Sequence, residues 1–275
     1  MSSRKIKRRR RPFLPAVILM SAVTALACFA YTDAPPAEQS ARVQAAFASA
    51  VPEEAAQAQA IFASAAPKEA AREIAPLDVP WIDQREEFPT GCESCCAAMA
   101  LQFAGVDCSA DTFIDWYLPT GTAPYQNEDG VLIGCDPREE FPGDPRTDAG
   151  WGCYAPVIEG ALRTILADYD DLTVYDLSGA SLQSVCRQSV GQGRPALIWV
   201  TIDMEPPQIS DQFYLEDSGE LFSWIYPMHC VVLTGETADG YYCNDPMRGK
   251  NCFYEKSAVE TAFEGLGCQA LVIGT

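Results

Sequence analysis

The amino-acid composition changes abruptly at Leu77, and this change confines the packed domain to the C-terminal part of the chain. Residues 77–275 are rich in aromatic residues, glycine and cysteine, and they are numerous enough to enclose one sizeable core. Residues 32–76 are instead rich in alanine, proline, glutamate and glutamine, with Phe-Ala-Ser-Ala repeated at Phe47 and Phe62. We expect a semi-rigid linker there, with helices broken at proline; a pair of partner-binding helices is the alternative.

The N-terminus has the pattern of an export signal. A basic run from Arg4 to Arg11 precedes an apolar stretch from Pro12 to about Tyr31, which is typical of a secretory signal peptide or a signal anchor. The apolar stretch is just long enough to span a bilayer if it is not cleaved, with its basic flank in the cytoplasm. We therefore predict that residues 1–31 are a signal peptide or a single membrane anchor, and that the protein is extracellular or at the cell surface.

The charge of the chain argues against several classes of partner. The chain has 19 Lys and Arg against 38 Asp and Glu, and seven of the basic residues lie between Arg4 and Arg11. The rest of the chain is therefore strongly acidic and would repel phosphate groups, so we predict no nucleic-acid partner and no polyanionic substrate. His229 is the only histidine, which argues against most zinc sites. We predict no metal and no organic cofactor.

The cysteine count is high for a chain of this kind. There are 12 cysteines, and Cys28 lies in the predicted leader. In the oxidising compartment that an exported protein enters, we expect most of the others to form disulfides. Their odd number leaves at least one thiol unpaired. Cys243 and Cys252 flank a turn and are expected to face each other, whereas the spacing assigns no other pair.

The order of helices and strands favours an α+β fold over a doubly wound fold, because helices precede most of the strands. Gly91 and Gly105 bracket the first helix, and Ser257 is expected to cap the last one. We expect helices over 92–103, 154–167, 181–190 and 257–263, and strands over 196–202, 230–234, 241–244, 252–254 and 269–273. Residues 107–150 are expected to be rich in loops.

Cys92 is the candidate nucleophile because it opens the first predicted helix. A thiol at a helix N-terminus lies at the positive end of the helix dipole, which predicts a lowered pKa. Gly91 is expected to let the backbone turn tightly into this helix. Gln84, eight residues upstream, is the candidate donor to an oxyanion, together with the backbone N–H of Cys92. Glu93 is expected to cap the helix; tuning of the thiol is the alternative.

His229 and Asp245 are the candidate base and its orienting carboxylate. His229 begins a predicted strand, and Asp245 ends the strand that returns from the turn at Thr237–Gly240. A hairpin centred near residue 238 places Asp245 opposite about residue 231, on the same face as His229. The two side chains are then diagonal neighbours within hydrogen-bond reach. A carboxylate so placed fixes the tautomer of the imidazole and stabilises its protonated form.

These residues lie in segments that resemble a known family, the stand-alone, secreted members of cysteine-peptidase family thirty-nine. These are papain-like proteins related to the double-glycine peptidases that process bacteriocins. The resemblance implies a helical lobe that carries the Cys and a sheet lobe that carries the His and the Asp. The matching segments are residues 77–84, 89–93, 150–156, 229–235 and 244–246.

By this resemblance Cys92 matches the nucleophile, His229 the base, Asp245 the third member and Gln84 the oxyanion glutamine. The chain departs from the family in its many cysteines, since Cys95 and Cys96 lie in the nucleophile helix. The resemblance implies that residues 77–275 hydrolyse peptide bonds. The substrate is expected to be a peptide or protein, with cell-wall peptide among the candidates.

Three further interpretations stay open at this stage. Trp151 and Gly152 form either a wall of the substrate groove or a tight turn with a packed tryptophan. The domain could keep the peptidase fold only to bind peptide or cell-wall material at the cell surface. Cys92 and Cys95 also form a CxxC pair at a helix start, as in thiol–disulfide oxidoreductases.

Overall fold

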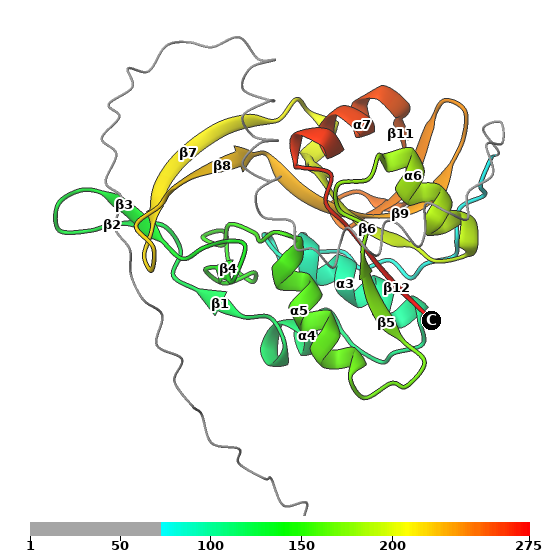
Figure 1. Ribbon diagram of the computed structural model, residues 1–275, viewed down its shortest axis with the longest axis horizontal. Coiled ribbons are helices and arrows are strands. Elements are labelled where there is room, and N and C mark those ends of the chain that lie inside the picture. Colours follow the sequence, from blue (N-terminus) through cyan, green and yellow to red (C-terminus); the bar gives the residue numbers. More distant parts are fainter. Residues whose placement is uncertain (1–72) are drawn as a thin grey trace, which may run out of the picture. The chain divides into compact units, whose positions relative to one another are not determined.

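The computed structural model describes residues 73–275 of the chain (Figure 1). The predicted leader over residues 1–31 lies outside the described residues, as does the predicted linker up to residue 72. In the part that the structure describes, no helix combines the length and the apolar character that crossing a bilayer requires.

An antiparallel sheet of six strands forms the centre of the fold (Figure 1). In sheet order its strands are β11 (Gly249–Glu255), β10 (Gly240–Asp245), β9 (Met228–Glu236), β6 (Ala196–Thr201), β12 (Ala270–Gly274) and β5 (Thr173–Asp176). The last strand, β12, lies between β6 and β5, so the C-terminus is held inside the sheet. Ile74 pairs with Glu236 at the end of β9.

Helices cover both faces of this sheet. Helices α3 (Cys92–Phe103) and α5 (Ala155–Leu166) pack on one face, and α6 (Leu182–Gln188) and α7 (Lys256–Gly265) pack on the other (Figure 1). All four helices were expected from the sequence, within one or two residues at most ends. The expected cap of α7 is wrong: Glu255 is the N-cap residue, and Ser257 lies inside the first turn.

The alternation of side chains along β6 divides the apolar interior into two cores. Leu197 and Trp199 point into the core beneath α3 and α5, whereas Ile198 and Val200 point into the core beneath α6 and α7. Because both faces are covered, every residue of β6 is buried. This double coverage explains why residues 196–200 form an uninterrupted apolar run in the sequence.

The region 107–150, which was expected to be loop, contains a helix. Helix α4 (Ala110–Trp116) begins at Ser109, whose side chain accepts a hydrogen bond from the Thr112 N–H. Phe113 anchors the helix in the core beneath α3. The many prolines and glycines of this region hid a serine N-cap that could have been recognised.

A second sheet extends away from the first, and the sequence analysis assigned no strands to its main hairpin (Figure 1). Most residues of β7 are exposed, so the hairpin lacks the regular apolar alternation that identifies a half-buried strand. The sheet has the order β2 (Tyr125–Gln126), β3 (Leu132–Gly134), β7 (Gln208–Leu215) and β8 (Leu221–Tyr226).

The remaining elements are short. Strand β1 (Thr120–Gly121) pairs with β4 (Phe141–Pro142), and 3₁₀ helices span Val190–Gln192 and Ile202–Met204.

Cys243 and Cys252 lie directly opposite each other on β10 and β11, as the turn between them predicted. All eleven cysteines within residues 73–275 are free thiols in the structure. The disulfides expected for an oxidising compartment therefore stay a prediction.

The core beneath α3 depends on Trp199, which is fully buried and donates a hydrogen bond from Nε1 to the Cys153 carbonyl at 2.8 Å. We expect Trp199→Ala to lower the free energy of unfolding by about 3 to 5 kcal/mol. Trp116, with 78% of its surface exposed, is the matched control, and Trp116→Ala should change stability by no more than about 0.5 kcal/mol. Urea unfolding followed by circular dichroism measures both, and equal losses would contradict the described packing.

Candidate active site

Cys92 is the first residue of α3, and its side chain is only 6% exposed. Gly91, the N-cap residue, has φ −100° and ψ 33°, so it does not need the conformational freedom that the sequence analysis assigned to it. The residue at position 91 is instead restricted to glycine by the small space around it. A Cβ at Gly91 would lie 3.0 Å from the Phe88 Cβ and 3.2 Å from the Pro145 Cβ. Glycine therefore lets two loops close around the start of the helix.

The packing of α3 on β9 brings the thiol beside the strand that carries His229. One turn along the helix, the Cys96 Sγ donates a hydrogen bond to the Cys230 carbonyl at 3.2 Å. The backbone N–H of Cys230 in turn hydrogen-bonds the Cys92 sulfur and favours its thiolate. The candidate nucleophile thus contacts the residue that follows His229.

His229 and Asp245 meet as the sequence predicted. Cys243 pairs with Leu233 and Asn244 with Val232, so Asp245 follows at the level of residue 231, as expected. The His229 Nε2 and the Asp245 Oδ1 are 2.9 Å apart, and both side chains are buried.

The Asp245 carboxylate has two further partners that the sequence analysis missed. Tyr254 donates its hydroxyl to Oδ2 at 2.5 Å, and the Met247 N–H donates to Oδ1 at 2.8 Å. Burial alone would raise the pKa of Asp245, but the bonds from His229, Tyr254 and Met247 outweigh it and hold the pKa below its usual value. Tyr254 gave no sequence signal, because a bulge between Cys243 and Asp245 shifts the register that would locate it.

Glu93 lies beside the thiol and is completely buried. Its Oε2 accepts a hydrogen bond from the Cys92 Sγ at 3.2 Å, and its Oε1 accepts one from the Cys153 N–H at 2.7 Å. Both interpretations of Glu93 have support, because its carboxylate contacts the thiol and also accepts a hydrogen bond from its own backbone N–H in the first turn of α3. The Gly91 N-cap itself has no side-chain partner.

The predicted lowering of the pKa of Cys92 is wrong for this structure. Burial raises the pKa of the Cys92 thiol well above its usual value, and the Glu93 carboxylate raises it further. These two effects outweigh the N–H of Cys230 and the position at the helix N-terminus. Among the described residues, the thiol has no hydrogen bond to His229.

Gln84 is buried on the loop that leads to α3. Its Nε2 donates to the Pro89 carbonyl at 3.0 Å and to the Phe88 carbonyl at 3.4 Å, while its Oε1 is buried without a hydrogen-bond partner. Both amide hydrogens are therefore directed at the loop rather than at a vacant oxyanion site. Its role as an oxyanion donor stays a prediction and requires the amide to rotate.

Trp151 packs edge-on against Phe213 and Trp224, with ring centroids 5.7 and 5.3 Å away. Gly152 follows with φ +123°, a conformation that favours glycine. This geometry is the tight turn with a packed tryptophan. The role of Trp151 and Gly152 in binding substrate stays a prediction.

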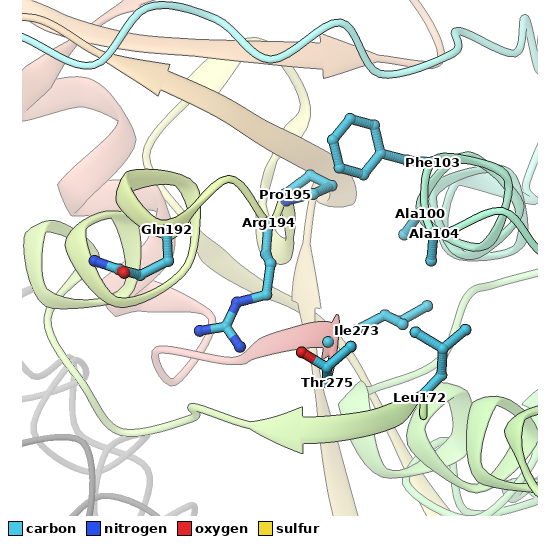
Figure 2. A pocket seen from close by; sticks show the side chains of 10 residues that line it. Ala100, Phe103, Ala104, Leu172, Gln192, Arg194, Pro195, Ile273 and Thr275 are labelled. Carbon is cyan, nitrogen blue, oxygen red and sulfur yellow. The ribbon is translucent and has the colours of Figure 1, made fainter. Parts of the chain in front are cut away.

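The cavity at the far end of α3 is lined by none of the candidate residues. A cavity of about 400 Å³ lies at the far end of α3 from Cys92, between that helix, β12 and the loop before β6. Figure 2 shows Phe103, Arg194 and Thr275 around this cavity, among other lining residues. Within residues 73–275, no group of three or more His, Cys, Asp or Glu side chains could hold a metal ion.

Comparison with known proteins identifies the class to which this fold and site belong. A model of the Peptidase_C39 like family matches residues 76–271, so the chain belongs to the C39-like peptidase family. Its helices and antiparallel sheet form an α+β, papain-like fold.

Two relatives support this assignment. The "Uncharacterized protein YvpB" of Bacillus subtilis (strain 168) is 31% identical over 200 residues, which cover 72% of this chain and 75% of that protein. A crystal structure from Bacillus anthracis, described as a "putative C39-like peptidase", matches with a TM-score of 0.62 and 26% identity. The match covers 74% of this chain and 98% of that one.

The Tyr254 hydroxyl is expected to stabilise the protein only while Asp245 is ionised. At pH 7, Tyr254→Phe should cost about 1.5 to 3 kcal/mol of unfolding free energy, since a hydrogen bond to a charged group is lost. Because the pKa of Asp245 is lowered in the folded state, this contribution is complete above about pH 4 and is lost as the pH falls through the lowered pKa.

Urea unfolding of both proteins from pH 3 to pH 7 measures this difference. Tyr242→Phe is the matched control, because the Tyr242 hydroxyl has no hydrogen bond among the described residues. A difference for Tyr254→Phe that stays constant over the whole pH range would argue against the ionised contact.

Proposed function

We propose that this chain is an exported cysteine peptidase that hydrolyses peptide bonds through Cys92, His229 and Asp245. The observation that carries the proposal is the buried hydrogen bond of 2.9 Å between His229 and Asp245. His229 lies on β9, which packs against the helix that Cys92 opens. Membership of the C39-like peptidase family supports the same reaction.

The geometry of the imidazole supports one order of proton transfers. Because the His229 Nε2 is engaged by Asp245, Nδ1 is the nitrogen that accepts the proton of the Cys92 thiol. The thiolate attacks the substrate carbonyl, and the Cys92 N–H and Gln84 stabilise the oxyanion. The protonated His229 then gives its proton to the leaving amine, which leaves a thioester on Cys92. Water, deprotonated by His229, hydrolyses this acyl-enzyme and restores the thiol.

The substrate and the location are part of the proposal. A peptidase family implies a peptide or protein substrate, and cell-wall peptide is a candidate for an enzyme outside the cell. Export is supported by the basic run and apolar stretch of residues 1–31. Of the predicted linker over residues 32–76, the part up to residue 72 then serves as the connection to the peptidase domain predicted over 77–275, because Ile74 already pairs with Glu236 of β9.

The alternative is a non-catalytic protein that keeps the fold to bind peptide. The raised pKa of Cys92 and the direction of its hydrogen bond towards Glu93 favour this alternative. A thiol–disulfide oxidoreductase has less support. Burial raises the pKa values of both Cys92 and Cys95, whereas the attacking thiol of an active CxxC pair has a lowered pKa.

Alkylation of the unreduced protein with iodoacetamide, mapped by mass spectrometry, tests the peptidase proposal. At pH 5 an ordinary thiol is almost entirely protonated, so Cys92 should react at least about 100-fold faster than an ordinary thiol would. Cys252 and Cys268, the two partly exposed cysteines among the described residues, are the internal references, and burial raises the pKa values of both. In His229→Ala the reaction of Cys92 at pH 5 should fall to the level of these references.

Peptide hydrolysis supplies the second half of the test. Cys92→Ala should abolish cleavage of a mixed peptide library, while Cys268→Ala, a substitution of a partly exposed thiol, should retain it. If Cys92 is unreactive at every pH and no peptide is cleaved, the peptidase proposal fails and the binding alternative takes its place.

A further inference from the structure

The carboxyl group of Glu93 faces the proposed nucleophile, and neither the family match nor the proposed triad assigns it a role. We propose that Glu93 is a further member of the catalytic machinery, which holds the proton of Cys92 away from His229 while it is ionised and releases the thiol when it is protonated. The enzyme would then be activated by acid. This inference rests on the proposed peptidase function and adds a residue to that site.

The contacts of Glu93 place it at the reacting atom. Its two carboxyl oxygens contact the Cys92 Sγ at 3.2 Å and the Cys153 N–H at 2.7 Å. The side chain is fully buried, so water does not replace either partner. The resting thiol therefore donates to Glu93, and it makes no described hydrogen bond to His229.

The loop before α5 holds the carboxyl group in this position. A Cβ at Gly152 would lie 2.8 Å from the Glu93 Oε1 and 2.5 Å from the Met228 Cε. The glycine therefore leaves only enough space for the carboxyl group between the loop and the nucleophile helix. Movement of Glu93 away from Cys92 would require this loop to move as well.

The number of protons held by Glu93, His229 and Cys92 makes the activity depend on pH. In the resting site Glu93 is ionised, His229 is neutral and Cys92 is a thiol, so the three groups share one proton. In the reactive site Cys92 is a thiolate and His229 is an imidazolium. Ionised Glu93 would then place a second negative charge beside the sulfur, within a buried site where water does not screen it. Protonation of Glu93 removes that repulsion, and the three groups then hold two protons.

One proton from solvent thus accompanies the change from the resting to the reactive site. It binds to Glu93, while the proton of the thiol passes to the His229 Nδ1. No bond other than these proton bonds is made or broken, and no oxidant or metal takes part. Acid therefore favours the reactive form, with a dependence of one proton.

Among the described residues, His229 is the basic group that lowers the pKa of Glu93. None of the ion pairs among the described residues includes Glu93, and burial raises its pKa against the lowering effects of its hydrogen bonds and of His229. The other groups that face it are thiols and a phenol, whose pKa values are raised by burial and which stay neutral from acid to neutral pH. They are Cys92 and Cys95 on α3, Cys230 on β9, and Cys153 and Tyr154 before α5.

Glu93→Gln separates the proposed role from a purely structural one. The glutamine Oε1 can still accept from the Cys153 N–H, and its Nε2 can donate to the Cys92 sulfur. A structural role predicts little change in the pH dependence. The proposed role predicts that the variant loses it, because the amide carries no titrating proton.

The test measures kcat/KM and the alkylation rate of Cys92 in the full chain between pH 4 and pH 8. In the wild type both should fall about tenfold per pH unit above the pKa of Glu93, as expected for one proton. In Glu93→Gln this fall of the alkylation rate should be absent, so that the ratio of the variant's rate to the wild-type rate grows about tenfold per pH unit above that pKa. Glu236→Gln is the matched control: Glu236 is also buried, pairs with Lys256 away from this site, and should leave the profile parallel to the wild type.

The outcomes distinguish this inference from the proposed function. Parallel profiles for Glu93→Gln and the wild type, with Cys92 still reactive, would overturn the role of Glu93 and leave the triad in place. A Cys92 that reacts in neither protein at any pH would overturn the peptidase function itself. If Glu93→Gln does not fold, the alkylation rate of Cys92 in the wild type decides, because loss of the His229 proton alone leaves the thiolate reactive. An alkylation rate that falls as the pH rises supports the role of Glu93, and a rate that only rises contradicts it.

Discussion

The packing of α3 against β9 and β6 is the contact on which the rest of the domain depends. It buries the helix from Cys92 to Leu101 and places it in one continuous core with Trp199 and Val232. The same contact carries Cys92 to the residue that follows His229. Stability and the candidate chemistry therefore come from one interface, and a change that weakens this core would also displace the thiol.

Burial decides the electrostatics of the site. A helix N-terminus favours a thiolate at Cys92 by a modest amount, which the cost of burying the charge outweighs. The core around Cys92 excludes water, and the Glu93 carboxylate lies 3.2 Å from the sulfur. Asp245 lies in similar surroundings but has three hydrogen-bond donors, which keep it ionised. The number of donors around each group, rather than burial alone, determines which one carries charge.

Features that depend on residues close together in the sequence could be predicted from it, whereas features that depend on remote residues could not. The turn at Thr237–Gly240 predicts the pairing of β9 with β10 and so brings His229 near Asp245, although a bulge between Tyr242 and Cys243 sets the final level of Asp245 at residue 231. The hairpin of β7 and β8 could not be, because its exposed side chains have no regular alternation. The pKa of Cys92 was predicted in the wrong direction, since the loop and strand that bury it are remote in sequence.

The candidate site is assembled from residues at both ends of the domain. Near the start of the domain, the Trp81 indole Nε1–H donates a hydrogen bond of 2.8 Å to the backbone carbonyl of Asp245 on β10. During synthesis Cys92 leaves the ribosome long before His229, and Asp245 comes last. A nascent chain therefore carries the thiol as an ordinary cysteine. It acquires a base and an orienting carboxylate only when the C-terminal strands have folded onto α3.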